Sequence, residues 1–474
     1  MDRLGSWLLA ALAAGVAQSS EPIDIGSRLE LFVDMHCIEI LDGVQLVLHP
    51  PCPAGKVLAF DRDWEGRYCG YVTVLKDDDV FRMYYRGLPV AGKDGSATEV
   101  TCYAESQDGI EWTKPDLGIY EIDGSRRNNV VLAEAAPFSH NFAPFIDSRP
   151  GTPPDVRFKA VAGTEATGLV GFASADGLHW TRLYDAPLLE EGAFDSQNVV
   201  FWSEVEQRYC CYFRTWKDKI RRISRAVSED FIHWSEPDLM EYSEKPVEHL
   251  YTNQTLPYPR ALHIYVATAA RFVPGRRVLT PEQAAQVGVE ERYAGDCSDA
   301  VFMTSRGGNT YDRTFMEAFV RPGLGLSNWT SRTNYPAWGI VQTGPEELSL
   351  YVQRNYGQPG HYLERLRLRL DGFASVRGSY RGGEMITRLI RFAGGSLFVN
   401  YSTSAAGGIL VEIRDEAGAP LAGFTVHDCD ALIGDEIDRK VTWQGNGDLS
   451  AIAGKAVHVR FVIQDADLFS MQFR

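Results

Sequence analysis

The sequence predicts an all-β protein, a five-bladed β-propeller followed by a C-terminal β-sandwich. Three observations predict it: a turn motif that recurs along the chain, an apolar strand with polar residues at its start upstream of each copy, and a change of strand pattern after Leu370. Helical patterning is almost absent, and its best candidate is the segment 280–291, which Thr280 would cap. A large irregular β-sandwich is the alternative, but it would not explain copies that recur in order.

The recurring turn begins with Ser-x-Asp and places Trp at its seventh position. It occurs as SQDGIEWTKP at 106–115, SADGLHWTRL at 174–183 and SEDFIHWSEP at 228–237, and a degenerate fourth copy, SRGGNTYDRT at 305–314, has Tyr instead of Trp. Each copy follows a short alternating strand, and a fifth strand, YLERLRLRLDGFASV, takes the corresponding place after the last gap. The pattern is typical of a strand, a tight turn and an aromatic side chain that packs under the turn.

Upstream of each copy lies an inner apolar strand that begins with polar residues. The five segments start at Asp63, Ser139, Phe194, Glu248 and Thr333, and a second strand follows each of them. Units of this size with several short strands indicate propeller blades, and five copies indicate five blades. We assign residues 51–372 to the propeller, residues 20–50 to lead-in strands and residues 373–474 to the sandwich.

The first 19 residues have the pattern of a secretory signal, with Arg3, an apolar stretch from Leu8 to Val16, and small residues before Ser19 or Ser20. A short membrane anchor is the alternative, but the apolar stretch is shorter than the ~20 residues that a span needs. We therefore expect a secreted or periplasmic protein with no membrane span once the signal is removed.

The composition and net charge of the chain limit the classes of molecule that it is expected to bind. The 474 residues are 45% hydrophobic and carry a formal net charge of −16, which predicts a globular chain and argues against nucleic acid or an anionic membrane as the main partner. The eight cysteines show no metal-binding spacing; Cys37–Cys52 and Cys69–Cys102 are plausible disulfides, and buried free thiols are the alternative. No cofactor is expected, except that the acidic segment His427–Asp438 fits either a structural calcium site or a solvated loop.

The inner strands of a propeller line one channel, and their starts converge at one rim, to which the antiparallel second strands return. Four of the five second strands end with an arginine, namely Arg86, Arg214, Arg271 and Arg354. With polar residues from the starts of the inner strands, the expected ligand-binding set is Arg86, His140, Asn141, Asn198, Arg214, His249, Asn253, Arg271, Asn334 and Tyr335. Gathered guanidinium groups bind carboxylates or sulfates, so we expect an anionic ligand; the alternative is that each Arg pairs with an acid of its own blade.

Five blades, an export signal, the S-x-D-G-x-x-W turns and a trailing sandwich together resemble the five-bladed propeller glycoside hydrolases, the arabinanase–levansucrase–invertase group with families 32, 43 and 68. The resemblance covers residues 50–372, and the sandwich is similar to the one appended to family 32 enzymes. The family 32 motifs W-M-N-D-P-N-G, R-D-P and E-C are absent, and DWEG, SHNF and FDSQN stand at the matching strand starts. The resemblance therefore implies the fold and a carbohydrate substrate, but it transfers no catalytic residues.

Glycoside hydrolysis needs two carboxyl groups beside the scissile bond, one protonated and one ionised. Asp195 is the expected nucleophile or general base because it precedes a buried strand next to Gln197 and Asn198, and Glu65 and Glu248 compete for the role of general acid. The sequence thus predicts a secreted glycoside hydrolase acting on a poly- or oligosaccharide with an acidic sugar, such as a uronate, a sialate or a sulfated residue. A non-catalytic carbohydrate-binding propeller and a glycan phosphorylase, whose arginines would bind phosphate, are the alternatives.

Overall fold

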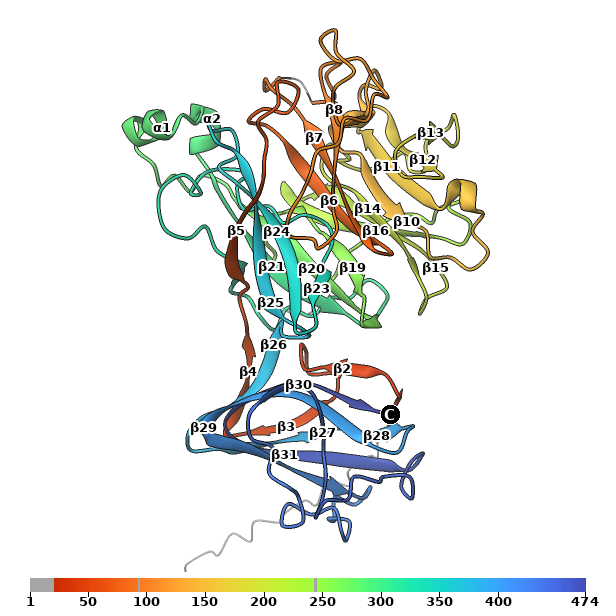
Figure 1. Cartoon of the computed structure of the whole chain (residues 1–474), viewed down its shortest axis with the longest axis vertical. Coiled ribbons are helices and arrows are strands. Elements are labelled where there is room, and N and C mark those ends of the chain that lie inside the picture. Colours follow the sequence, from red (N-terminus) through yellow and green to blue (C-terminus); the bar gives the residue numbers. More distant parts are fainter. Residues whose placement is uncertain (1–20, 93, 243–244) are drawn as a thin grey trace, which may run out of the picture.

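The computed structural model describes residues 21–92, 94–242 and 245–474, which form two β-rich lobes joined end to end (Figure 1). Within these residues, strand pairing gives five blade sheets and one ten-stranded sheet. The all-β class, with a five-bladed propeller and a β-sandwich, is confirmed. The signal predicted for residues 1–19 lies outside the described residues, and among the others no helix is long and apolar enough to cross a membrane.

The first four blades are antiparallel sheets whose strands follow one another in chain order. Blade 1 consists of β6 (Gly70–Asp77), β7 (Val80–Gly87), β8 (Val100–Ser106) and β9 (Val130–Leu132); blade 2 of β10 (Ala143–Ile146), β11 (Phe158–Thr164), β12 (Gly168–Ser174) and β13 (Thr181–Arg182); blade 3 of β14 (Val199–Ser203), β15 (Arg208–Lys217), β16 (Ile220–Ser228) and β17 (Asp238–Leu239); blade 4 of β18 (Leu250–Thr252), β19 (Thr255–Tyr258), β20 (Ala261–Val273), β21 (Cys297–Ser305) and β22 (Ala318–Val320). The predicted inner strand of blade 4 is divided, because β18 and β19 both pair with β20.

Blade 5 is completed by the start of the propeller chain. It contains β23 (Val341–Gly344), β24 (Glu347–Arg354) and β25 (Tyr362–Arg369), and its outermost strand is β5 (Cys52–Ala59), which pairs antiparallel with β25. Main-chain hydrogen bonds between the first and last strands therefore seal the ring of blades. The sequence does not indicate the partner of β5, because its exposed residues lack the alternation of polar and apolar side chains that is typical of a half-buried strand.

The recurring turns share one hydrogen-bond pattern in three blades. The Asp108 carboxylate accepts two backbone amides of its turn at 2.7 and 2.8 Å, and Trp112 donates its indole proton to the carbonyl of Gly109 at 3.2 Å. The copies around Asp176 and Asp230 repeat both features. These bonds hold the aromatic ring beneath the turn, as the motif predicts.

An insertion between β20 and β21 of blade 4 contains the predicted helix. It forms α1 (Pro281–Val287), with Thr280 as N-cap in a capping box with Gln283, and a second short helix, α2 (Glu291–Ala294). Figure 1 shows both helices at the side of the propeller. The insertion matters for function because α2 contributes two side chains to the pocket described below.

The four lead-in strands belong to the second lobe. They are β1 (Ile23–Gly26), β2 (Leu29–Leu31), β3 (Ile38–Asp42) and β4 (Val44–Leu48), and they pair in one sheet with β26 (Ala374–Gly378), β27 (Gly383–Thr387), β28 (Ile390–Phe392), β29 (Leu397–Arg414), β30 (Asp435–Lys440) and β31 (Ala456–Phe473). The sandwich is thus built from both ends of the described chain, and the propeller is inserted between them. The eight cysteines all lie in the described residues and are free thiols, so neither candidate disulfide is formed.

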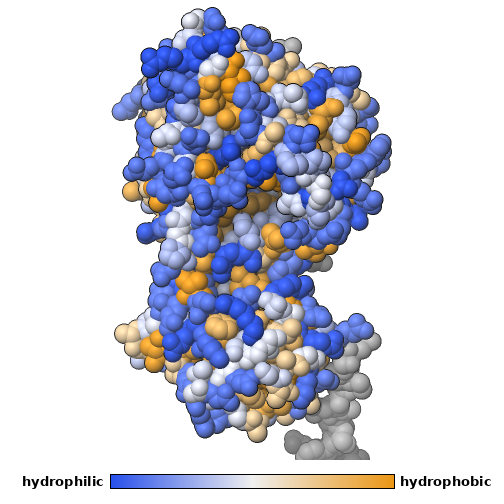
Figure 2. All heavy atoms as spheres, turned by 45° about the vertical axis from the view of Figure 1, so that its right-hand side comes forward, coloured by the Kyte–Doolittle hydropathy of each residue, from blue (hydrophilic) through white to orange (hydrophobic). Residues whose placement is uncertain are grey.

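Buried ionic groups join the two lobes where the molecular surface narrows (Figure 2). Glu30 of β2 is fully buried and pairs with His263 at 3.0 Å and with Arg306 at 2.5 Å, both from blade 4. Arg306 also bonds Asp34 at 3.0 Å. Breaking a buried pair leaves an uncompensated charge, which makes separation of the lobes at this point costly.

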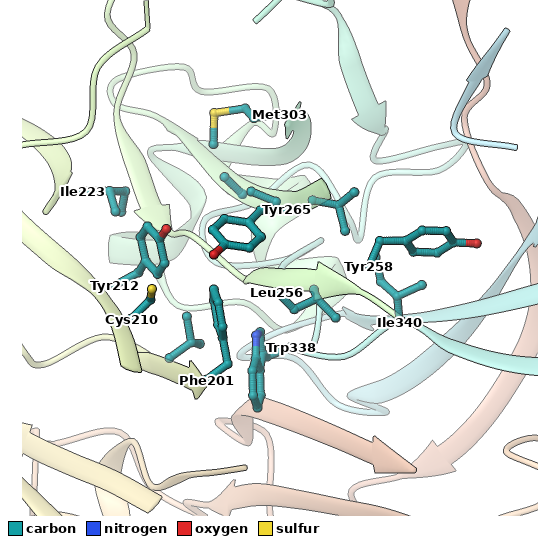
Figure 3. Close-up of a cluster of buried hydrophobic side chains, with 14 of the residues drawn as sticks. Phe201, Cys210, Tyr212, Ile223, Leu256, Tyr258, Tyr265, Met303, Trp338 and Ile340 are labelled. Atoms are coloured by element: carbon teal, nitrogen blue, oxygen red, sulfur yellow. The ribbon is translucent and has the colours of Figure 1, made fainter. Parts of the chain in front are cut away.

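The propeller core is continuous between blades 3, 4 and 5. Phe201 of β14 meets Tyr265 of β20 edge-on, with ring centroids 5.2 Å apart, and Trp338 lies beside them in the same cluster (Figure 3). Trp338 also donates its indole proton to the carbonyl of Thr255 at 2.8 Å. Aromatic side chains that pack between blades fix the blades rigidly, and with them the rim where their strands begin.

Candidate functional site

The polar residues that precede the inner strands tie the blades together across the channel. The Gln197 amide donates to the carbonyl of Val72 at 3.1 Å, and the Gln254 amide donates to Gln197 Oε1 and to the carbonyl of Pro336, both at 2.8 Å. These contacts link blades 1, 3, 4 and 5. Because a buried amide is stable only when its hydrogen bonds are made, the pair of glutamines holds these four blades together.

Asn141 and Asn198, predicted to bind substrate, have a similar structural task. The Asn141 amide donates to the carbonyls of Gly163 and Ser196, each at 2.8 Å, and to that of Phe194. The Asn198 amide donates to the carbonyls of Phe194 and Ser196 at 2.9 and 3.0 Å. Both side chains are fully buried and do not line the pocket at the rim. Their positions correct the prediction: they hold the loop before β14 in place.

A cavity of about 460 Å³ opens at the rim where the inner strands start and the second strands end. Its size is within the range of small-molecule sites. The lining residues are Arg86, Leu88, Ala91, Gly92, Asp94, Arg221, Tyr251, Phe272, Arg292, Tyr293, Asp296, Ser331, Arg332 and Tyr356. Blades 1, 3, 4 and 5 and helix α2 all contribute, so the site exists only in the closed ring.

The pocket contains an excess of positive charge. Among the described residues, Arg86, Arg221 and Arg332 have no carboxylate within 4.0 Å, although all three line the cavity. The buried Nε atoms of Arg86 and Arg221 also lack a hydrogen-bond partner in the described part of the chain. Guanidinium groups left without anions in a concave site are suited to bind an anionic ligand.

Asp195, the expected base, lies beside the pocket and is connected to Arg86. Its carboxylate pairs with Arg214, and its side chain is 34% exposed. Its carbonyl accepts the Tyr71 hydroxyl at 3.1 Å and lies 3.3 Å from His140 Nε2. Arg86 stacks over the Tyr71 ring at 4.7 Å and contacts His140 at 3.3 Å. The structure therefore brings Asp195, Arg214, His140 and Arg86 into one cluster.

His140 is a supporting residue and not a lining residue. It is fully buried in the 3₁₀ turn η1 (Phe138–His140), and its Nδ1 lies 2.8 Å from Glu99. Burial would raise the pKa of Glu99, but the hydrogen bond and charge of His140 lower it below its usual value. The Glu99–His140 pair fixes the position of Arg86 from behind.

Tyr251 of β18 stands at the centre of the arginines. The guanidinium carbons of Arg214, Arg221 and Arg332 lie 4.8, 5.3 and 5.7 Å from its ring centroid. Burial alone would raise the pKa of the Tyr251 hydroxyl, but the charges of Arg332 and Arg214 outweigh it and lower the pKa below its ordinary value. Tyr251 is not among the residues predicted to bind the substrate.

Glu65 does not enter the pocket, which corrects its assignment as a candidate general acid. Its backbone is at the rim, where its carbonyl accepts the Leu88 amide at 2.7 Å. Its side chain is fully buried, does not line the pocket and is bonded to Tyr85 and to Lys114, both at 2.6 Å. A carboxylate held in this way has no access to a substrate.

Glu248 and Arg271 form a separate ionic network in blade 4. Glu248 pairs with Arg271 at 2.8 Å and with Arg313 at 2.7 Å, and Arg271 also holds Asp299 at 2.6 Å. Arg354 likewise pairs with Glu364 of blade 5 at 2.8 Å. Arg271, Arg354 and Arg214 each pair with an acid of their own blade, which is the alternative that the sequence left open. Arg86 has no such partner among the described residues.

The remaining predicted residues surround the pocket without lining it. Asn253 accepts the Thr255 amide at 3.0 Å, and Asn334 donates to the carbonyl of Ser298 at 2.8 Å, so both stabilise loops. Tyr335 packs behind Tyr251 with ring centroids 5.2 Å apart.

His249 lies at the edge of the site, where its Nδ1 accepts the amide of Arg221 at 3.3 Å. Burial and the charge of Arg221 lower the pKa of His249.

Arg221, Arg332 and Tyr251 are absent from the predicted set of ligand-binding residues. Arg221 lies directly across the β15–β16 hairpin from Trp216, and Arg332 is one residue before the predicted fifth inner segment. Tyr251 follows His249 by two residues, and residues two apart on a strand face the same side. These spacings were visible in the sequence, but only closure of the ring shows that three separate segments share one cavity.

Within the part of the chain that the structure describes, no group of three or more His, Cys, Asp or Glu side chains is placed to hold a metal ion. In the acidic segment, Asp428 accepts the Thr425 hydroxyl at 2.7 Å, and Asp430 accepts the Thr442 hydroxyl at 2.6 Å and the Gly445 amide at 2.8 Å. The carboxylates thus stabilise turns of the sandwich.

Comparison with known proteins gives similar structures but no family. A scan against models of protein families finds no match, and a search of curated proteins finds none. Similar solved structures include a protein described as a glycoside hydrolase, with 12% identity and a TM-score of 0.45 over 68% of this chain and 92% of that chain. Others are an N-acetylgalactosamine deacetylase from F. plautii in complex with blood group B trisaccharide (12%, 0.43, 69% and 96%) and the catalytic domain of the Coprinopsis cinerea GH62 α-L-arabinofuranosidase (11%, 0.43, 69% and 98%). By its own strand pairing and site, the chain is a five-bladed propeller with a cationic, aromatic-lined pocket at one rim.

Proposed function

We propose that the chain is a glycoside hydrolase that binds an acidic sugar of a poly- or oligosaccharide in the rim pocket and cleaves its glycosidic bond there. The observation that carries the proposal is the set of Arg86, Arg221 and Arg332, which line the cavity without carboxylate partners among the described residues. Tyrosine and phenylalanine rings in the same lining provide flat apolar surfaces, which suit the faces of a sugar ring. Asp195 is the carboxylate that acts as general base or nucleophile.

The binding part of the proposal is tested by calorimetric titration with acidic and neutral oligosaccharides of equal length. We expect Arg86→Gln and Arg332→Gln each to weaken binding of acidic oligosaccharides about 10- to 100-fold, since a charge-assisted hydrogen bond contributes about 1.5–3 kcal/mol. Arg391→Gln, an exposed arginine of the sandwich strand β28, is the charge-matched control and should bind as the wild type does. Equal affinity for acidic and neutral oligosaccharides would contradict the proposal.

The cleavage part is tested by release of reducing ends from the glycans that bind. We expect Asp195→Asn to abolish release while it leaves binding in place, because the amide keeps the size of the side chain but cannot accept a proton. Binding without release by the wild-type protein would indicate the non-catalytic carbohydrate-binding alternative.

Phosphorolysis is the second candidate, because unpaired guanidinium groups also suit inorganic phosphate. Turnover that requires phosphate and yields a sugar phosphate would identify it, whereas hydrolysis proceeds in phosphate-free buffer. Export also stays a prediction, since it rests on residues 1–19 alone; the N-terminal sequence of the mature protein would test it.

A further inference from the structure

The expected base, Asp195, lies beside the rim pocket, but the second carboxyl group that hydrolysis was expected to use is not at the positions predicted for it. Glu65 and Glu248 are each held by two partners outside the pocket. Of the lining carboxylates, Asp94 is 49% exposed, and Asp296 accepts the Gly275 amide at 2.7 Å. Asp94 is thus open to solvent, and Asp296 is bonded to the main chain. A side chain of another kind is therefore considered as the proton donor to the leaving group.

Tyr251 has the position that such a proton donor needs. It lines the cavity, and its ring is held from behind by Tyr335 and Phe272, whose centroids lie 5.2 and 6.0 Å away. Arg214 connects it to the expected base, because this guanidinium stacks over the Tyr251 ring at 4.8 Å and pairs with the Asp195 carboxylate. The phenol and the carboxylate therefore flank one arginine at the same rim.

We propose that Tyr251 is the general acid that acts with Asp195 in this pocket, an inference that rests on the proposed glycoside hydrolysis. In the step, Asp195 takes a proton from water, the water oxygen bonds to the anomeric carbon, and the bond from that carbon to the glycosidic oxygen breaks. The leaving oxygen receives the Tyr251 proton. The sugar gains the hydroxyl group of the water, and the leaving alcohol gains a proton. The proton taken up by Asp195 returns to Tyr251 through solvent, which restores both side chains.

The charge that this step leaves on Tyr251 is stabilised by its surroundings. The titratable and charged groups that face the phenol are Arg214, Arg221, Arg332, Asp195, Tyr71 and Tyr335. Three of them are guanidinium groups within 6 Å of the ring, and one is a carboxylate. Positive charges favour the phenolate, so they bring the pKa of Tyr251 down toward the range in which a phenol can donate a proton during catalysis.

The first test is an ultraviolet difference titration of the tyrosines in the full-length protein, which needs no substrate. We expect one tyrosine of the wild type to ionise at a lower pH than the others, and we expect Tyr251→Phe to remove this early transition. Tyr380→Phe is the matched control, since Tyr380 is 71% exposed in the second lobe and does not line the pocket; it should keep the transition. If Tyr251→Phe shows the same early tyrosine transition as the wild type, the inference is overturned.

The second test separates acid catalysis from a structural role by the leaving group. The probes are nitrophenyl and methyl glycosides of hexuronic acids, sialic acid and sulfated hexoses. A nitrophenolate can leave without being protonated, whereas an alkoxide cannot. Tyr251→Phe should therefore lower kcat/KM for the methyl glycosides by about 10²- to 10⁴-fold and for the nitrophenyl glycosides by less than about tenfold.

The outcomes distinguish this inference from the function on which it rests. Equal losses on both kinds of glycoside would assign Tyr251 a positioning role and overturn the inference while hydrolysis stands. A wild-type protein that cleaves neither kind overturns the proposed hydrolysis and the inference together. Tyr380→Phe should retain the wild-type ratio between the two kinds of glycoside.

Discussion

At the scale of single residues, two acids with similar sequence contexts have opposite environments. Asp195 and Glu65 both precede an inner strand, yet Asp195 is partly exposed beside the pocket, while Glu65 is fully buried against Lys114 and Tyr85. The difference arises from the direction of the side chain, which the backbone of each loop sets. A polar residue that precedes an inner strand therefore has its backbone near the rim. Whether it can contact a ligand depends on the direction of its side chain.

We expect Glu65→Gln to affect stability and not ligand binding. The amide cannot neutralise Lys114, whose side chain is only 10% exposed and would keep only the exposed Asp61, at 3.1 Å, as an acidic partner, so the free energy of unfolding should fall by about 2–3 kcal/mol. Urea denaturation measures this change, and titration with an acidic oligosaccharide at a temperature where the variant is folded should give the wild-type affinity. Loss of cleavage at unchanged stability would instead restore Glu65 as a catalytic candidate.

At the scale of elements, the recurring turns show how one motif tolerates substitution. The position after the turn Asp has positive φ in all three regular copies, 72° at Gly109, 77° at Gly177 and 71° at Phe231. Phe231 departs from the glycine preference because its ring is buried against Tyr209 and Trp234, with centroids 5.2 and 5.8 Å away. Packing in blade 3 thus outweighs backbone strain.

Replacing this residue by glycine tests which effect is larger. Phe231→Gly relieves a left-handed conformation that costs about 1–2 kcal/mol, but it also removes a buried aromatic side chain, whose loss costs about 3–5 kcal/mol. We expect a net destabilisation of about 2–3 kcal/mol, measured by denaturant unfolding. A variant that is more stable than the wild type would show that strain dominates this turn.

At the scale of the whole molecule, the two lobes form one structure because the sandwich uses both ends of the described chain. Strands β1–β4 pair with strands that follow the propeller, and Glu30 of β2 is bonded to His263 and Arg306 of blade 4. Burial would raise the pKa of Glu30, but its bonds to His263 and Arg306 lower it to about 2. The interface is therefore sensitive to acid.

The sign of this dependence follows from the lowered pKa. Unfolded Glu30 has its ordinary pKa of 4.5, so its contribution is complete above about pH 5 and is lost as the pH falls toward 2. A shift of this size corresponds to about 3 kcal/mol. We expect the thermal unfolding temperature of the wild type to fall steeply between about pH 5 and pH 2. The unfolding temperature of Glu30→Gln should be lower than that of the wild type at pH 7 and should decrease less over the same pH range. Parallel pH profiles for the two proteins would contradict this role for Glu30.

Much of this architecture was readable from local patterns. The Ser-x-Asp turns, the alternating strands and the capped segment at Thr280 depend on nearest neighbours in sequence, so five blades, a trailing sandwich and the helix were predicted. The rim was also predicted, because antiparallel pairing places Arg86 opposite Gly70 whatever the rest of the chain does. These features need only short-range physics.

What only the tertiary structure decided is which side chains share a space. Arg221, Arg332 and Tyr251 come from separate blades and meet only when β5 closes the ring, while Glu65 and Glu248 are drawn into ion pairs with residues far along the chain. The sequence alone determined the blades and the approximate position of the site. The structure decided the charge and the membership of the pocket, because a buried charge must find its partner in space, and a linear pattern does not show where that partner lies.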